Sequence, residues 1–285
     1  MIINHKVTQI DDELGIPLCI KQPAVSDGSH ATLFSFMGAN GGVGVTSLCV
    51  QLAYDLTQRN QGRVCLIDLD FENGATASYL DMTPSLYPEE LSINPDRMDQ
   101  DLVKSFLTQH VSGLNIIAAY NSLDGNRQIN TQALLSLLDH VSEMFDYIIM
   151  DIPRLWTPWT HAAIAASDTF SMVCELTIPS LKSLQSRELM IQNEIKMDRP
   201  VGVVINKHER RSFRNALKIK DAEKTIGRPL SSAIGIYADF VKDAINRGVP
   251  MGVANPKCRY NKEAGKLLDS LLQDIDAQPH LQKAR

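Results

Sequence analysis

The sequence predicts an α/β protein, a single doubly wound domain whose mostly parallel sheet is covered by helices on both faces. Three observations predict this fold. Short apolar runs alternate along the chain with longer segments whose apolar residues recur at helical spacing. The apolar runs are nearly continuous, which is typical of strands that are buried on both faces. A glycine-rich segment joins the first apolar run to the first helical pattern, and ligands of such sheets bind at this kind of turn.

The elements are expected within one folded domain over residues 31–276. Residues 1–30 contain prolines and a Ser-Asp-Gly-Ser cluster and carry little periodicity, so they are expected to form an irregular leader, and residues 277–285 a polar tail. The apolar runs predict strands at 32–37, 64–69, 114–118, 147–150, 169–176, 201–205 and 230–236. The periodic segments predict helices at 46–58, 98–110, 130–144, 158–166, 180–196, 213–226, 239–247 and 260–276. The proline-containing stretch 82–95 is expected to be a surface loop.

The composition excludes several classes of protein. Of the 285 residues 44% are hydrophobic and 21% charged, as in ordinary globular proteins, and the net charge of −5 argues against a general polyanion binder. No apolar run approaches the roughly 18 residues of a membrane span, and the first residues lack the features of a signal peptide. The five cysteines are scattered without a C-x-x-C pair, which favours reduced thiols in the cytoplasm, and the histidines lack zinc-ligand spacing.

The glycine-rich segment Ala39–Ser47 has the pattern of a phosphate-binding loop. A strand, a glycine loop and a helix together let backbone N–H groups converge on phosphate oxygens at the positive end of the helix. Compared with the general pattern G-x-x-x-x-G-K-[ST], Ala39 replaces the first glycine and Val45 the lysine. The residues expected to bind the nucleotide here are Asn40, Gly41, Gly42, Val43, Gly44, Val45, Thr46 and Ser47.

Three carboxylates follow predicted strands. Asp68 and Asp70 stand two residues apart where the second strand ends, so they share one face if the strand continues. Asp151 follows four apolar residues, a pattern typical of the strand that holds Mg²⁺ opposite the loop threonine. We therefore expect Asp70 to orient an attacking water as the catalytic residue, and Thr46, Asp68 and Asp151 to hold the metal. The alternative for Asp68 and Asp70 is an ordinary solvated strand end, and the Asp151 pattern is a weak signal when taken alone.

These motifs resemble the MinD/ParA group of deviant P-loop ATPases and, within it, most closely the CpaE/TadZ proteins of tight-adherence (Flp) pilus assembly. The resemblance covers roughly residues 32–268. Apart from the loop, it is carried by Asp68-Leu-Asp70, Arg97-Met-Asp99, Asp151-Ile-Pro-Arg154, Pro158-Trp-Thr160, Ile178–Leu184, Asp221–Pro229 and Asp239–Pro250.

The resemblance implies ATP and Mg²⁺ as cofactors and a nucleotide-linked homodimer. It also implies that Asn206 contacts adenine, although Asn206 could equally be a turn residue, and that residues around Pro250 line the base pocket. Pilus or secretion machinery proteins are the implied partners. The implied location is cytoplasmic, peripheral at the inner face of the membrane or at the cell pole, with membrane association through partners.

Two departures from the family concern charge. Asn40 replaces the signature lysine that reaches phosphates across the dimer, as small residues often do in CpaE/TadZ proteins, and Val45 replaces the second lysine. A charge-assisted hydrogen bond is worth about 1.5–3 kcal/mol, so each loss weakens ATP binding about 10- to 150-fold. Loss of a cation that stabilises the transferred phosphoryl group can lower the rate of hydrolysis even more than it weakens ATP binding. We therefore expect ATP–Mg²⁺ binding with slow or no hydrolysis. Arg154 could supply a compensating charge, and the alternative is a surface arginine.

A further departure concerns length, because larger CpaE/TadZ proteins carry an N-terminal receiver-like domain where this sequence has about 30 residues. The resemblance therefore does not extend to the targeting or partner functions that reside in that domain.

Other functions remain open. An active MinD/ParA-like ATPase could position cargo on membrane or nucleoid, a degenerate module could act without nucleotide, and an accessory factor of cellulose secretion could share the fold. The segment 207–228 has eight basic and three acidic residues and could bind DNA, although a solvated face or a partner contact is favoured.

The last helix is expected to pack rather than to insert into membrane. Trp156 and Trp159 are expected in the core or a lid rather than in a partner patch.

Overall fold

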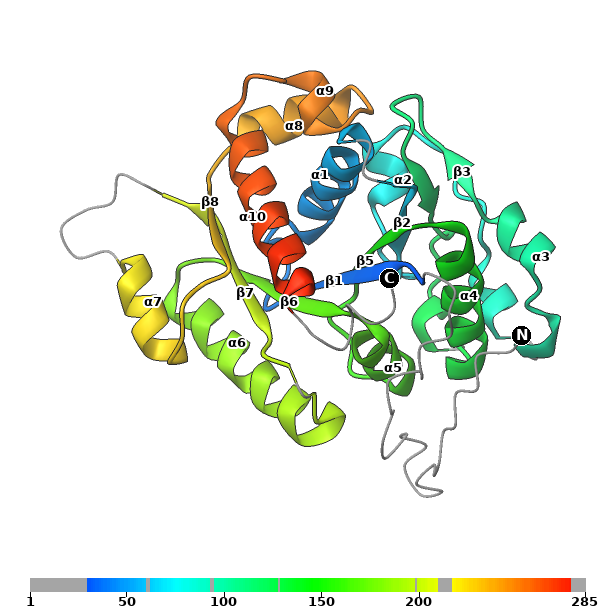
Figure 1. Ribbon diagram of the computed structural model, residues 1–285, viewed down its shortest axis with the longest axis horizontal. Helices are drawn as coiled ribbons and strands as arrows, with labels where there is room; N and C mark the ends of the chain where they lie inside the picture. The colour runs from blue at the N-terminus through cyan, green and yellow to red at the C-terminus, as the bar shows by residue number, and fades with distance from the viewer. Residues whose placement is uncertain are drawn as a thin grey trace.

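The structure, a computed structural model, describes residues 30–59, 62–92, 95–127, 129–197, 199–209 and 217–277. Nearly all of the expected leader and tail lie outside these residues. The described residues form a single α/β domain around one sheet with the strand order β3-β4-β2-β5-β1-β6-β7-β8 (Figure 1). The strands are β1 (Thr32–Gly38), β2 (Val64–Asp68), β3 (Thr108–Gln109), β4 (Asn115–Ile117), β5 (Tyr147–Ile152), β6 (Thr169–Cys174), β7 (Gly202–His208) and β8 (Ser232–Gly235).

Every pair of neighbouring strands is parallel except β3 and β4, which are antiparallel. The predicted α/β class with a mostly parallel sheet is therefore confirmed. The helices are α1 (Val45–Gln58), α2 (Thr76–Tyr79), α3 (Gln100–Ser105), α4 (Thr131–Met144), α5 (Pro158–Ala166), α6 (Ile178–Met190), α7 (Ile219–Ile226), α8 (Ala238–Asn246), α9 (Met251–Ala254) and α10 (Arg259–Asp276).

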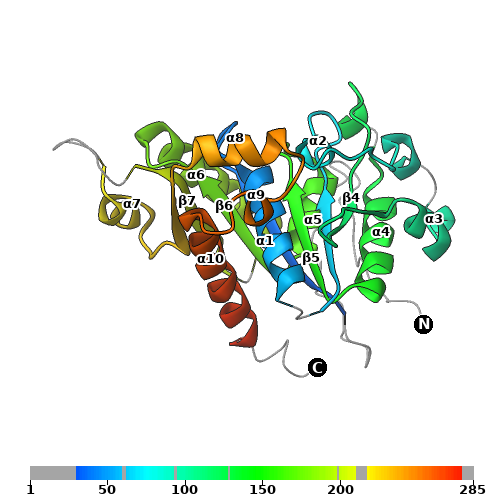
Figure 2. The same cartoon turned by 90° about the horizontal axis from the view of Figure 1, so that it is seen from above.

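Helices cover both faces of the sheet (Figures 1 and 2), and buried apolar side chains form one layer on each face. Alternate residues of β1 enter different layers: Leu33 and Met37 contact the layer that includes α4, α5 and α6, while Phe34 and Phe36 contact the layer of α1 and α10. Because both faces of the sheet are covered, the sequence of β1 is apolar almost throughout rather than alternating. Helix α10 packs against α1 and β8, as expected for a packing helix. Among the described residues, no helix is both long and apolar enough to cross a membrane.

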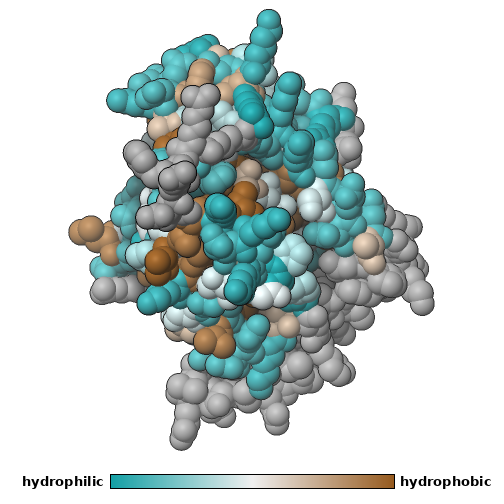
Figure 3. All heavy atoms as spheres, turned by 90° about the vertical axis from the view of Figure 1, so that its left-hand side faces the viewer, coloured by the Kyte–Doolittle hydropathy of each residue, from teal (hydrophilic) through white to brown (hydrophobic). Residues whose placement is uncertain are grey.

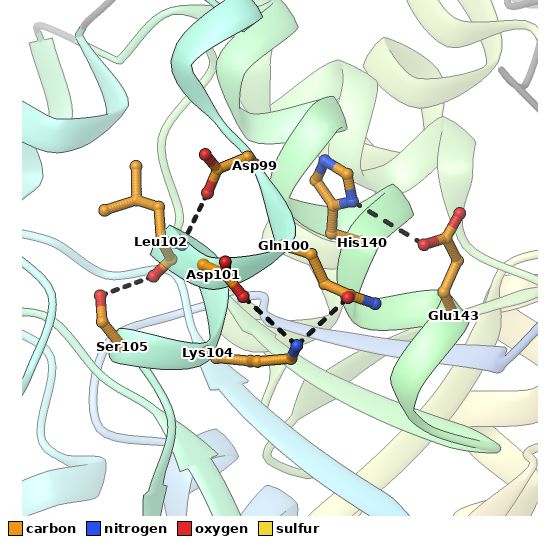
Figure 4. Close-up of polar contacts among 8 residues, drawn as sticks. All are labelled: Asp99, Gln100, Asp101, Leu102, Lys104, Ser105, His140 and Glu143. Atoms are coloured by element: carbon orange, nitrogen blue, oxygen red, sulfur yellow. Dashed lines mark hydrogen bonds and ion pairs between the residues drawn. The ribbon is translucent and has the colours of Figure 1, made fainter.

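The helix predicted over 98–110 is wrong in its second half. Asp99 begins α3 by accepting a 2.8 Å hydrogen bond from the backbone N–H of Leu102, and the helix ends at Ser105 (Figure 4). Thr108 and Gln109 then pair with β4, and the hairpin closes through Gly113 at φ 87°. Residues 108 and 109 therefore belong to a strand, although the apolar spacing of the helix continues through them.

Other boundaries also differ from the prediction. Helix α7 begins at Ile219, not at residue 213, because Lys218 is extended and its N–H donates to the Asp221 carboxylate. The last predicted turn of α6 is a π-helical segment, Ile191–Ile195. The expected loop 82–95 contains a short 3₁₀ helix, Pro88–Leu91. On α4, His140 donates to the carbonyl of Met98 across 2.8 Å, which attaches the segment before α3 to the domain.

Asp55 on α1 gives a test of this packing. Burial raises its pKa from the ordinary value to about 6, although Gln51 donates a 2.7 Å hydrogen bond to it. The native state therefore binds this proton more tightly than the unfolded state, and stability is lost as the pH rises from about 4 to 6. Asp55→Asn should raise the free energy of unfolding by about 1–3 kcal/mol above that window and leave it unchanged below it. Urea unfolding across pH measures this, and a pH-independent difference would contradict it.

Candidate functional site

The loop between β1 and α1 keeps the backbone of a phosphate cradle. Gly42 and Gly44 are left-handed, at φ 73° and 88°, and a Cβ on Gly44 would lie 2.8 Å from Nδ2 of Asn206. Glycine is therefore required at position 44. No side chain caps α1, and in the described part of the chain the N–H groups of Gly44, Val45 and Thr46 donate no hydrogen bond. Such free N–H groups at a helix N-terminus can bind an anion.

Thr46 and two aspartates meet beside this loop. The Thr46 hydroxyl donates a 2.6 Å hydrogen bond to Oδ2 of Asp151, and Asp151 is the register partner of Asp68 on the neighbouring strand. Both carboxylates are buried. Burial, followed by the Asp68 carboxylate, raises the pKa of Asp151 well above its usual range, and burial also raises the pKa of Asp68. No ion pair among the described residues involves either carboxylate, so the described part of the chain gives this pair no counter-charge.

This donor set fits Mg²⁺ together with phosphate. The described residues hold no cluster of three or more His, Cys, Asp or Glu that could bind a metal alone. Mg²⁺ is usually bound by one or two carboxylates and completes its ligands with water and phosphate oxygens. Thr46, Asp68 and Asp151 would hold it, and its charge would stabilise the charge on the phosphates.

Asp70 lies just beyond β2, where its own turn holds it. Its Oδ1 accepts hydrogen bonds from the N–H groups of Glu72 (3.3 Å) and Asn73 (3.0 Å) and from Asn126 Nδ2 (3.4 Å). The hydrogen bonds of the described residues leave its Oδ2 unused. No described contact joins Asp70 to the loop, so its role in orienting water stays a prediction.

Asn206 contacts the loop directly, whereas Pro250 lies in a separate hollow. The buried Asn206 side chain donates a 2.8 Å hydrogen bond from Nδ2 to the carbonyl of Val43, so it fixes the loop. Pro250 lines a small hollow against α1, together with Ser47. No contact among the described residues brings Asn206 and Pro250 together, and their contacts with a base stay predictions.

Helix α6 supports the loop through contacts that the sequence reasoning missed. Ser180 donates a 2.7 Å hydrogen bond to Oδ1 of Asn40, and the carbonyl of Ala39 accepts from Ser183 (2.7 Å) and from Nε of Arg187 (3.3 Å). The available signal was spacing, because residues 180, 183 and 187 share one helix face. Arg154 also approaches the loop: its Nη2 lies 3.1 Å from where a Cβ on Gly41 would stand.

Two of the remaining candidates, Trp159 and Arg228, have structural partners. Trp159 is buried against Phe71 and donates to the carbonyl of Asn126 across 2.9 Å, so it belongs to the core. Of the basic segment, Arg210, Arg211 and Arg214 lie outside the described residues. Arg228 pairs with Glu188 and donates to the carbonyl of Val201 across 2.7 Å. This arginine therefore fastens the end of the segment to α6 and β7.

A parallel sheet with a phosphate cradle and two aspartates at its carboxyl edge defines a nucleotide-binding α/β protein. A family model described as AAA domain (AAA_31) matches residues 31–198, and the chain belongs to this family. A ParA family protein of Chlamydia muridarum is 26% identical over 246 residues, covering 81% of this chain and 94% of the relative. An uncharacterised protein of Pseudomonas putida is 30% identical over 157 residues, 51% of this chain and 57% of its own length.

Solved structures share the fold. The ParA family ATPase from Chlorobium tepidum TLS superposes with a TM-score of 0.72 at 21% identity, covering 84% of this chain and 98% of that chain. The cell division ATPase MinD of Pyrococcus furiosus gives a TM-score of 0.70 at 16% identity, covering 85% and 99%. The family match and the ParA relative support membership of the MinD/ParA group, and these structures show that the chain has the same fold.

The Asp151→Asn variant distinguishes two effects of the buried carboxylate: the stability that its burial costs and its proposed role as a ligand of Mg²⁺. Because the folded-state pKa of Asp151 is raised, the native protein loses stability as the pH rises above the usual aspartate range. Asparagine still accepts the Thr46 hydrogen bond, so the variant should gain about 1 kcal/mol or more at neutral pH without ligand. If the wild type binds ATP with Mg²⁺, the variant should bind ATP with a weaker dependence on Mg²⁺. Thermal unfolding and calorimetry test both effects, and an unchanged Mg²⁺ dependence would exclude Asp151 as a ligand.

Proposed function

We propose that this protein is a nucleotide-dependent assembly and localisation factor that binds ATP with Mg²⁺ and hydrolyses it slowly or not at all. One observation carries the proposal. The hydrogen bond from Thr46 to Asp151 and the open backbone cradle persist beside a loop without lysine. The parts that would bind phosphate and metal are therefore retained, while the cations of the loop that would accelerate transfer are absent.

The proposed roles follow from position. The backbone of residues 40–47 would bind the phosphates, and Thr46, Asp68 and Asp151 would hold Mg²⁺. Asp70 would orient water in whatever hydrolysis occurs, and its unused Oδ2 is available for that hydrogen bond. Asn206 and Pro250 would lie near the base. In this structure Asn206 already binds the carbonyl of Val43, so its contact with the loop would link base and phosphate binding.

The machine served is proposed from the sequence resemblance to CpaE/TadZ proteins, namely an Flp-type pilus or a related secretion apparatus. Support comes from the stretches around Arg97, Pro158 and Ile178, and from Asn40 at the position where that branch often has a small residue. A MinD of Aquifex aeolicus has been solved in complex with MinC, so a protein of this fold can hold a protein partner. By analogy, nucleotide occupancy would set partner binding here. Membrane association would be indirect, through such partners.

Exposed apolar side chains support a nucleotide-linked homodimer. Ile178, Ile236 and Phe240 are 58%, 50% and 48% exposed, and each follows the carboxyl end of β6 or β8. This is the sheet edge at which the loop lies. The face of the molecule toward α7 and β8 shows apolar groups among polar ones (Figure 3). A second copy that covered this edge would bury these side chains and enclose the nucleotide.

The first experiment is calorimetry of Mg²⁺–ATP binding, with phosphate release followed in the same sample. We expect binding in the micromolar to millimolar range and little release. Asp70→Asn should leave the affinity nearly unchanged. Release that Asp70→Asn abolishes would support the alternative of an active ATPase that positions cargo. No binding at millimolar ATP would overturn the proposal in favour of a nucleotide-free interaction module.

The dimer surface can be tested with Phe240→Ser. We expect this variant to weaken ATP-dependent dimerisation at least about 10-fold, because burying a phenylalanine side chain is worth about 1.5–3 kcal/mol. Val111→Ser is the matched control, since Val111 is 94% exposed in the hairpin before β4, at the opposite edge of the sheet. Sedimentation velocity with and without Mg²⁺–ATP measures the dimer. Equal effects of the two substitutions would show that the dimer forms elsewhere.

A further inference from the structure

Three basic side chains from separate parts of the chain converge on the loop that lacks lysine. Arg187, on α6, donates from Nε to the carbonyl of Ala39. Arg154, just after β5, places Nη2 beside Gly41. Lys207 donates from Nζ to the carbonyl of Gly42. Each side chain therefore meets a different residue of the loop.

The two arginines differ from the lysine in their charge partners. Lys207 forms an ion pair with Glu175, at 3.4 Å between Nζ and Oε1. In the described part of the chain, neither Arg154 nor Arg187 forms an ion pair with a carboxylate. Burial and then the nearby guanidinium of Arg154 lower the pKa of Arg187, so the two cations lie close enough to repel one another. Two adjacent cations without a counter-charge favour a multiply charged anion between them.

The loop cannot supply this charge itself. Asn40 is neutral, and its Oδ1 is taken up by the hydroxyl of Ser180. Val45 packs partly against the apolar layer of α1 and α10. Positive charge at the cradle must therefore come from other elements, and Arg154 and Arg187 are the cations beside it that no carboxylate neutralises among the described residues.

We propose that Arg154 and Arg187 form a two-guanidinium clamp that binds the terminal phosphate of a nucleoside triphosphate in place of both missing loop lysines. This inference rests on the proposed function, because it requires that the loop binds nucleotide. Arginine suits the role because a guanidinium carries five N–H donors in a planar fork. Arg187 can thus keep its bond to Ala39 and still direct other donors at phosphate oxygens. The clamp makes the site selective for a triphosphate over a diphosphate, which lacks the group that both arginines contact.

The test compares Mg²⁺–ATP and Mg²⁺–ADP binding by calorimetry in Arg154→Gln, Arg187→Gln and the double variant. Each single substitution should weaken ATP binding about 10-fold or more, as expected for loss of a charge-assisted hydrogen bond, and should change ADP binding much less. Arg63→Gln is the matched control. Arg63 is an exposed arginine that pairs with Asp146 just before β2, at the opposite edge of the sheet, and its substitution should leave both affinities unchanged.

A rescue experiment distinguishes replacement of lysine from a structural role. Adding Val45→Lys to the double variant should restore ATP affinity at least about 10-fold, because it returns one charge-assisted hydrogen bond to the cradle. Thermal unfolding without ligand verifies that each variant is folded. If the wild type binds ATP and the arginine variants bind it as tightly as Arg63→Gln does, the clamp is wrong and the proposed function stands. If the wild type binds no ATP, the proposed function and the clamp both fail.

Discussion

The hydrogen bond between Thr46 and Asp151 is the contact on which the rest of the site depends. It joins the first turn of α1 to the carboxyl end of β5. This strand is the neighbour of β1, from which the loop departs. Asn206 makes the matching connection from β7, through the carbonyl of Val43. The loop is thus held from both sides of β1 by side chains, which leaves the N–H groups of its last residues free. A binding site made of backbone donors needs this support, because the backbone alone would not hold them in one direction.

Much of this arrangement could be predicted from the sequence. Continuous apolar runs indicate buried parallel strands, and the carboxyl ends of such strands share one edge, so Asp68, Asp151 and the loop could be expected together. The helix predicted through residue 110 ends early because Thr108 and Gln109 pair with β4, and apolar spacing does not reveal this pairing. The contacts of Ser180 and Arg187 could not be found in the same way. Helical periodicity identifies the face that packs on the sheet, but it does not say which loop lies above the other face.

The loss of lysine from the loop changes where positive charge resides. In the general pattern the cation is part of the loop and moves with it. Here the basic groups beside the loop come from three other elements, so their positions depend on tertiary packing. The bulge between β7 and β8, with Lys207 left-handed at φ 53°, turns that side chain toward Gly42. Charge at this site is therefore sensitive to the packing of distant parts of the sheet.

Helix α6 also has a mechanical consequence. Ser180 attaches its first turn to Asn40, while Leu189 and Met190 at its last turn are 59% and 39% exposed. At about 1.5 Å per residue, these two ends are roughly 15 Å apart along one stiff rod. A shift of the loop that kept its bonds to Ser180, Ser183 and Arg187 would move the helix with it. Leu189 and Met190 would then change position at the surface whenever the loop backbone does.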